Sequence, residues 1–106
     1  MKAVEAKELC LDVWEYLAGH PEIEHKSDLP RDLWVRIVHL NSRCPLCEYF
    51  RSQCSRCPLR SCSENVNTAW RRWNNYSLPK VKRMNAAMEI VKKVRSWDAE
   101  ALDSKA

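Results

Sequence analysis

The chain has 106 residues and a formal net charge of +4 at pH 7. It contains six cysteines and five tryptophans but only one glycine. This length supports a single domain, residues 1–106, with one modest core. Because an average protein contains about 7% glycine, a single glycine excludes a tight phosphate-cradling loop and disfavours sandwiches and barrels. The abundance of Ala, Leu, Val, Glu, Lys and Arg predicts a mostly α-helical domain of about four helices.

Residues 3–18 are predicted to form the first helix, since their apolar side chains recur at the spacing of one buried stripe. Cys10 lies in that stripe, and we expect it to be a small buried hydrophobe outside any metal site. Gly19 and the following His20-Pro21 end the helix. The N-terminal residues lack the apolar run of a signal peptide, and no stretch is apolar enough to span a membrane. We therefore expect a cytoplasmic protein without a membrane partner.

A second helix is predicted at residues 30–41, with Ser27 or Asp28 near its cap and Pro30 in its first turn. Its predicted core side consists of Leu33, Trp34, Ile37, Val38 and Leu40. A cysteine-rich metal loop at residues 42–63 follows directly, so the helix end should hold the first cysteine of that loop in a fixed position.

Five cysteines fall within nineteen residues, and four of them form two Cys-x-x-Cys pairs. A tetrahedral zinc ion takes thiolates at about 2.3 Å, and two such pairs can close its coordination shell. We predict a structural Zn²⁺ site without an open position for catalysis, because four thiolates fill the shell. Its ligands are four of the five residues Cys44, Cys47, Cys54, Cys57 and Cys62, and the spacing does not choose among them.

Other interpretations of the cysteines remain open. An iron–sulfur cluster also takes four thiolates, and the cysteines could instead be redox thiols or disulfides. The tight clustering and the absence of an export signal argue against a disulfide framework. His39 could join a mixed shell with Cys44, although a surface position at the helix end is the simpler interpretation.

Two further helices are predicted after the cysteines, at residues 64–76 and 79–102. The first places Trp70 and Trp73 on one face and Arg71 and Arg72 on the other. The last is predicted to bury Val81, Met84, Ala87, Met88, Val91 and Val94, with Lys82, Arg83, Lys92, Lys93 and Arg95 around the remainder.

The cysteine pattern also carries a family resemblance. The run Cys44-Pro45-Leu46-Cys47-Glu48-Tyr49-Phe50, together with Cys54, Cys57-Pro58-Leu59 and Cys62, resembles small cysteine-rich proteins encoded by prokaryotes and their viruses. The resemblance spans residues 20–97 and implies that Cys62 belongs to the metal site. It implies a metal-bound helical miniature protein and no particular activity.

The charges are unevenly distributed along the chain. Residues 1–30 hold three Lys and seven Asp or Glu, a net charge of −4, whereas residues 31–106 carry +8. A basic segment can contact phosphates, and residues 69–76 combine Arg71 and Arg72 with aromatic rings that could stack on bases. Because Trp70 and Trp73 are three residues apart on one helical face, they suit the core better than an exposed stacking surface.

No Ser-His-Asp arrangement or deaminase signature occurs, so we predict that the protein is not an enzyme. The leading hypothesis is a zinc-binding protein-interaction module, an adaptor or inhibitor that presents helix faces to another protein. Tyr49 and Phe50 are its candidate surface residues, unless they cover the metal site and pack on Trp70 or Trp73. The alternatives are a nucleic-acid-binding zinc protein that uses residues 69–76 and an iron–sulfur redox or sensor protein. The sequence does not fix the oligomeric state.

Overall fold

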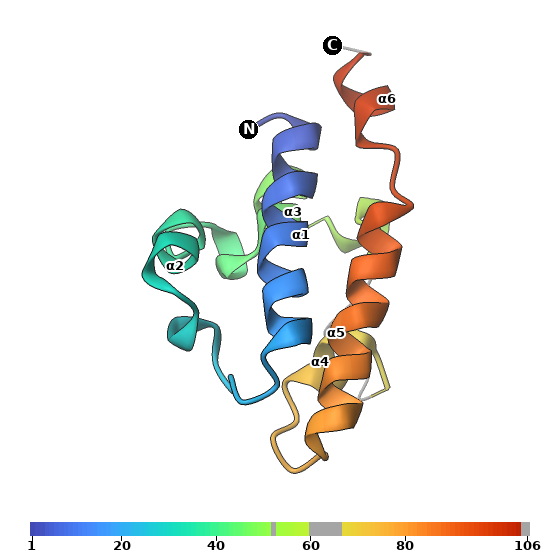
Figure 1. Ribbon diagram of the computed structural model, residues 1–106. Coiled ribbons are helices and arrows are strands. Elements are labelled where there is room, and N and C mark those ends of the chain that lie inside the picture. Colours follow the sequence, from blue (N-terminus) through green and yellow to red (C-terminus); the bar gives the residue numbers. More distant parts are fainter. Residues whose placement is uncertain (52, 60–66, 105–106) are drawn as a thin grey trace.

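A computed structural model describes residues 1–51, 53–59 and 67–104, and it confirms a mostly helical chain (Figure 1). These residues contain no strand. The α-helices are α1 (Ala3–Gly19), α2 (Arg31–Ile37), α3 (Pro45–Phe50), α4 (Ala69–Trp73), α5 (Lys80–Arg95) and α6 (Ala99–Asp103), and short 3₁₀ turns lie at Lys26–Asp28, Asn41–Arg43 and Cys54–Arg56. None of the helices in the described part of the chain is both long and apolar enough to cross a membrane.

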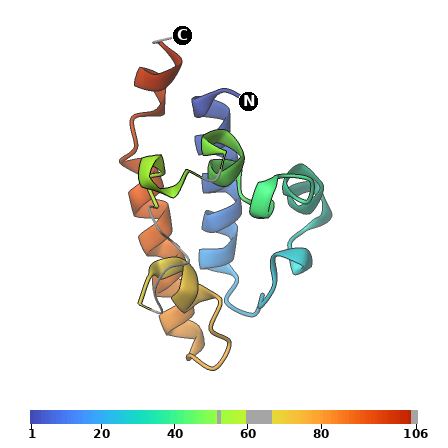
Figure 2. The same cartoon turned by 180° about the vertical axis from the view of Figure 1, so that it is seen from behind.

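The two long helices, α1 and α5, lie side by side and form the centre of the molecule (Figures 1 and 2). Helices α3 and α6 pack on α1, and α4 packs on α5. Trp14 of α1 and Trp73 of α4 meet in this core, with ring centroids 5.2 Å apart and ring planes at 84°. This edge-to-face geometry is a favoured aromatic arrangement, so the contact fixes α4 against α1 as well as burying apolar surface.

Three predicted segments differ from the observed elements. Helix α2 ends at Ile37, and the chain then turns through the 3₁₀ segment Asn41–Arg43, in which Ser42 and Arg43 have φ of 55° and 50°. The cysteine segment 42–63 contains α3 and a 3₁₀ turn. Of the predicted helix 64–76, the described part is helical at Ala69–Trp73.

The C-terminal segment forms two helices where the sequence predicts one. Helix α5 ends at Arg95, and α6 begins at Ala99. The side chain of Asp98 accepts a hydrogen bond from the Ala101 N–H at 3.2 Å and so caps α6. An aspartate cap satisfies a backbone donor that has no partner within the helix, which favours a new helix start at this position.

The second helix also differs in which side chains it buries. Leu33, Ile37 and Leu40 are buried as predicted, whereas Val38 is 41% exposed and Trp34 is half-buried. Val38 is the helical cap residue after Ile37, and one residue is about 100° around a helix, so Val38 lies outside the stripe that buries Leu33 and Ile37.

Helix α5 has a second apolar stripe beside its core face. Its core face consists of Arg83, Ala86, Ala87, Ile90, Val91 and Val94. The prediction was right for Ala87, Val91 and Val94, but wrong for Val81 and Met88, which are 59% and 38% exposed. At 3.6 residues per turn, Val81, Met84 and Met88 form one stripe next to the core face, in which Val81 and Met88 are exposed and Met84 is half-buried. We call these three residues the outer apolar face of α5.

Arg83 is a polar residue of the core. The prediction from the sequence, which put Arg83 on the solvated side of the last helix, was wrong. Arg83 is 3% exposed. Its guanidinium donates hydrogen bonds to the backbone oxygens of Trp73 at 2.8 Å, Ile23 at 3.0 Å and Pro21 at 3.2 Å. A buried charge needs such hydrogen bonds to offset its lost hydration, and these three hold the loop after α1 against α4 and α5.

Candidate metal centre and aromatic pocket

The start of α3 brings the first two cysteines together. Cys44 is the last residue before the helix, Pro45 occupies its first position, and Cys47 lies in its first turn. Proline suits this position because the first helical N–H needs no partner within the helix. The Glu48 carboxylate accepts a hydrogen bond from the Asn41 N–H at 2.9 Å and ties α3 to the preceding turn.

The surroundings of Cys44 favour its thiolate form. A hydrogen bond from the Cys47 side chain is the main reason that the pKa of Cys44 falls from 9.0 to about 6. The Lys26 charge and the backbone N–H groups of Cys47 and Leu46 lower this pKa further, while burial opposes them. Because the thiolate is the form that binds metals, this environment suits a soft metal ion.

A third and a fourth cysteine lie in the same buried region. Cys10 of α1 is fully buried, as predicted, and Cys57 is buried beside the same core. Burial raises the pKa of Cys10 well above its ordinary value, and the thiols of Cys44 and Cys57 are close enough to raise it further. None of the four cysteines whose side chains the structure describes, Cys10, Cys44, Cys47 and Cys57, forms a disulfide.

The predicted zinc ligands are only partly described by the structure. Cys62 and the side chain of Cys54 lie outside the described residues. Among the side chains that are described, no group of three or more His, Cys, Asp or Glu could hold a metal ion. His39 is exposed at the end of the second helical segment, consistent with a surface position. The described donor set is therefore a preformed Cys44–Cys47 pair with Cys57 and Cys10 nearby.

Tyr49 and Phe50 of α3 pack toward the C-terminal part of the chain. Their rings lie 4.9 Å apart, and the Trp97 ring is 5.5 Å from Phe50 and 6.0 Å from Tyr49. Phe50 is buried and Tyr49 is half-buried. Their packing partner is thus Trp97 rather than Trp70 or Trp73. Both still line a surface hollow of about 540 Å³ together with Glu48 and Arg51.

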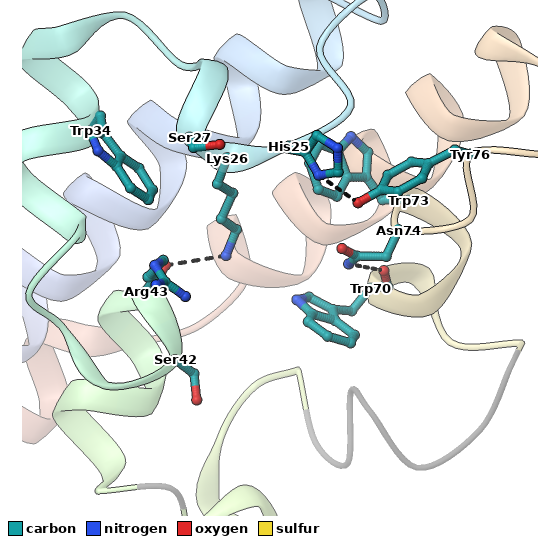
Figure 3. Close-up of a pocket in the computed structure, with 10 residues that line it drawn as sticks. All are labelled: His25, Lys26, Ser27, Trp34, Ser42, Arg43, Trp70, Trp73, Asn74 and Tyr76. Atoms are coloured by element: carbon teal, nitrogen blue, oxygen red, sulfur yellow. Dashed lines mark hydrogen bonds between the residues drawn. The ribbon is translucent and has the colours of Figure 1, made fainter.

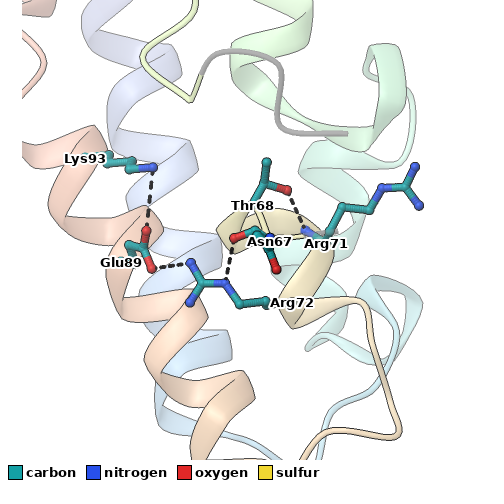
Figure 4. Close-up of polar contacts among 6 residues, drawn as sticks. All are labelled: Asn67, Thr68, Arg71, Arg72, Glu89 and Lys93. Atoms are coloured by element: carbon teal, nitrogen blue, oxygen red, sulfur yellow. Dashed lines mark hydrogen bonds and ion pairs between the residues drawn. The ribbon is translucent and has the colours of Figure 1, made fainter. Parts of the chain in front are cut away.

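The two arginines of α4 have different environments (Figure 4). Arg72 forms an ion pair with Glu89 of α5, and Lys93 approaches the same carboxylate at 3.7 Å. The Arg72 partner lowers the pKa of Glu89 below its ordinary value. Arg71 points away from α5, and its backbone N–H donates to the Thr68 side chain at 3.3 Å. Arg72 therefore connects α4 to α5, whereas Arg71 is exposed.

A pocket of about 360 Å³ lies between α4 and the segment that joins α1 to α3 (Figure 3). Trp34, Trp70, Trp73 and Tyr76 supply its aromatic walls. In Figure 3, the rings of Trp34 and Trp70 lie on opposite sides of Lys26 and Arg43. None of the described residues that line this pocket is an Asp or a Glu.

Hydrogen bonds fix several of the polar groups of the pocket. Lys26 Nζ donates to the Arg43 backbone oxygen at 3.2 Å, and the Tyr76 hydroxyl lies 2.9 Å from His25 Nδ1. Asn74 Nδ2 donates to the Trp70 backbone oxygen at 2.8 Å. Of these residues, the sequence had singled out only the segment 69–76. The others belong to separate segments, and no local pattern connects them to α4.

Comparison with protein-family models, with curated proteins and with solved structures found no match to this chain.

Proposed function

We propose that this protein is a zinc-stabilised helical module that binds another protein through the outer apolar face of α5. The single observation that carries the proposal is that α5 has a second apolar stripe outside its core face. The core face fills the interior of this chain, whereas Val81 and Met88 of the second stripe are exposed. Large apolar side chains exposed together on one helix are typical of a surface that another protein covers.

The charges around the outer apolar face indicate the kind of partner. Lys80, Lys82 and Lys92 are exposed and surround Val81, Met84 and Met88 on the same helix. An apolar stripe at positions i, i+3 and i+7 is the pattern by which a helix enters a hydrophobic groove. We therefore assign as partner a protein with an apolar groove whose rim is acidic, since such a rim complements the lysines.

Zinc is the proposed stabilising ion, held by four of Cys44, Cys47, Cys54, Cys57 and Cys62. The chemistry of the described donors supports it, because Cys44 and Cys47 form a close pair whose surroundings favour a thiolate. When bound, zinc would supply a closed tetrahedral link and no catalytic step. The ion would hold α3 and the residues after it against α1, which would stabilise the core behind α5.

The partner proposal is tested with a photo-crosslinking amino acid placed at Met88. The same amino acid at Glu8, an exposed position on α1, is the matched control. We expect the Met88 probe to give a crosslink that the control does not give, and the partner purified from it to bind the wild-type chain. The double substitution Val81→Glu and Met88→Glu should weaken that binding at least about tenfold, as loss of a central contact does.

Two results would contradict the partner proposal. One is identical crosslinking from the Met88 and Glu8 probes. The other is a crosslink only to a second copy of this chain, accompanied by a dimer in sedimentation. The double substitution Val81→Glu and Met88→Glu should leave the melting temperature nearly unchanged, because both side chains are exposed in the folded chain. A folded variant separates lost binding from lost structure.

The metal proposal is tested by elemental analysis and an absorption spectrum of protein purified without oxygen. We expect about one zinc per chain and no visible colour, as four-thiolate zinc sites give. Iron with a broad visible absorption band would identify a cluster instead. That result would overturn the zinc assignment and favour the redox or sensor alternative. The crosslinking test of α5 does not depend on which metal is found.

A further inference from the structure

The pocket beside α4 brings together aromatic and cationic groups from four elements of the chain. Trp34 comes from α2, Lys26 and Arg43 come from the turns on either side of α2, and Trp70 comes from α4. Its volume of about 360 Å³ lies at the lower end of the usual range for small-molecule sites. The site therefore has room for one compact ligand and not for a helix or a folded loop.

The electrostatics of the pocket favour an anion. Lys26 and Arg43 line it, and no carboxylate belongs to the described lining residues. Behind its wall, the buried guanidinium of Arg83 lies 5.0 Å from the Trp73 ring centroid and 5.5 Å from that of Tyr76. A cation held in a low-dielectric core is screened less than a surface cation, so Arg83 adds to the positive potential.

The aromatic rings favour a flat ligand. Trp34 and Trp70 are half-buried, so part of each ring remains accessible from the pocket. The Arg43 guanidinium carbon lies over the Trp34 ring, 5.8 Å from its centroid, so Trp34 positions this planar cation at the pocket. Aromatic rings bind the faces of nucleobases, and a guanidinium matches the geometry of a phosphate.

The backbone at Arg43 supports a role for this side chain. Ser42 and Arg43 both have positive φ, at 55° and 50°. Residues other than glycine adopt this left-handed region at a cost, and such positions are enriched at binding sites. The left-handed turn is also the segment that brings Arg43 to the rim of the pocket beside Trp34.

We propose that this pocket binds one nucleotide, with the base against Trp70 and the phosphate on Lys26 and on Arg43 beside Trp34. The nucleotide is either a free mononucleotide or one unit of a single strand. Both present the same base and phosphate chemistry to the pocket. This assignment is independent of the outer apolar face of α5, which is not part of the pocket.

The test is a titration of the full chain followed by the side-chain N–H signals of its tryptophans in NMR. The probes are AMP, UMP, short oligo(dT), duplex DNA of matched sequence and inorganic phosphate. We expect saturable shifts of the Trp34 and Trp70 signals, while Trp97, which packs on Phe50, stays unchanged. Saturation by AMP or UMP identifies a free nucleotide as the source, and saturation by oligo(dT) alone identifies a strand.

Arg43→Gln is the decisive variant, and Arg51→Gln is its control. Arg51 is also exposed and also has a left-handed backbone, with φ of 52°, but it lies at the end of α3 and outside the pocket. Both substitutions remove one charge from comparable backbone positions. We expect Arg43→Gln to lower affinity at least about fivefold and, for a strand, to reduce the salt slope by about 0.7, the value for one phosphate contact. Arg51→Gln should change neither.

A Trp70→Leu variant tests the stacking contact, with circular dichroism to verify that it is folded. We expect affinity to fall about 5-fold to 100-fold, the range that base–aromatic stacking gives. Equal effects of Arg43→Gln and Arg51→Gln would overturn the proposal. So would binding of inorganic phosphate as tight as that of the nucleotide, stronger binding to the duplex than to the single strand, or no saturable shift with any probe.

Discussion

The carboxylate of Asp103, near the C-terminus, accepts hydrogen bonds from the Ala3 N–H at 2.8 Å and the Val4 N–H at 3.0 Å. These are the first two residues of α1, whose own N-cap, Lys2, makes no side-chain capping bond. Asp103 therefore caps a helix that begins 100 residues earlier in the chain. A negative charge is also favourable at this end of the helix dipole. The two ends of the chain are joined by this contact (Figure 1).

Asp103→Asn should lower the melting temperature, because it removes the charge and one of the two acceptor oxygens. Glu24→Gln is the matched control, since Glu24 is exposed and its substitution changes the net charge by the same amount. Thermal unfolding followed by circular dichroism measures both variants. Equal melting temperatures for the two variants would show that the Asp103 contact contributes nothing to stability.

The Asp103 contribution should also depend on pH. The Val4 N–H bond, followed by the Ala3 N–H bond and the Lys2 charge, lowers the pKa of Asp103 in the folded chain. A lowered pKa in the folded state gives stability above the pKa of the unfolded chain, and that stability is lost as pH falls through the folded value. The difference in melting temperature between wild type and Asp103→Asn should stay constant down to about pH 4 and shrink below it. A difference that grows on acidification would contradict this sign.

Arg83→Met should be strongly destabilising because it leaves three backbone oxygens without their donor, those of Pro21, Ile23 and Trp73. We expect a loss of about 2–4 kcal/mol in the free energy of unfolding. Arg72→Met removes the same charge from an ion pair that is one-third or more exposed, so it should cost about 1 kcal/mol or less. Urea unfolding of both variants measures the difference. A similar loss in each would show that the carbonyl contacts of Arg83 are unimportant.

Helices α1 and α5 show why the sequence predicts some of the fold and not the rest. A helical stripe needs only neighbouring residues, so the apolar positions of α1, including Val13, Trp14 and Leu17, were predictable. Helix α5 carries two apolar stripes, and local periodicity cannot decide which one faces the core. Arg83 enters the core because three distant carbonyls accept its hydrogen bonds, and distant acceptors leave no local signal.

The candidate sites follow the same physical distinction. Cys44 and Cys47 are three residues apart, so their proximity is a property of one turn and could be predicted. The aromatic pocket depends on Lys26, Arg43 and Trp70, which lie in different segments. Their proximity results from the packing of α2 and α4 around α1 and α5, and therefore from the complete fold. The outer face of α5 was misassigned to the core for the same reason.

Cys47→Ser and Cys10→Ser should separate a metal ligand from a core cysteine. Cys47→Ser removes one thiol of the described pair, so zinc content should fall and the domain should lose much of its cooperative unfolding, because bound metal stabilises the fold directly. Cys10→Ser should retain zinc but lose about 1–3 kcal/mol of stability, the cost of a buried hydroxyl. Zinc analysis and thermal unfolding are measured on the same samples. Because Cys10 lies near Cys44 and Cys57, loss of zinc from Cys10→Ser would make Cys10 a ligand. Unchanged zinc and melting in Cys47→Ser would contradict the structural-zinc proposal.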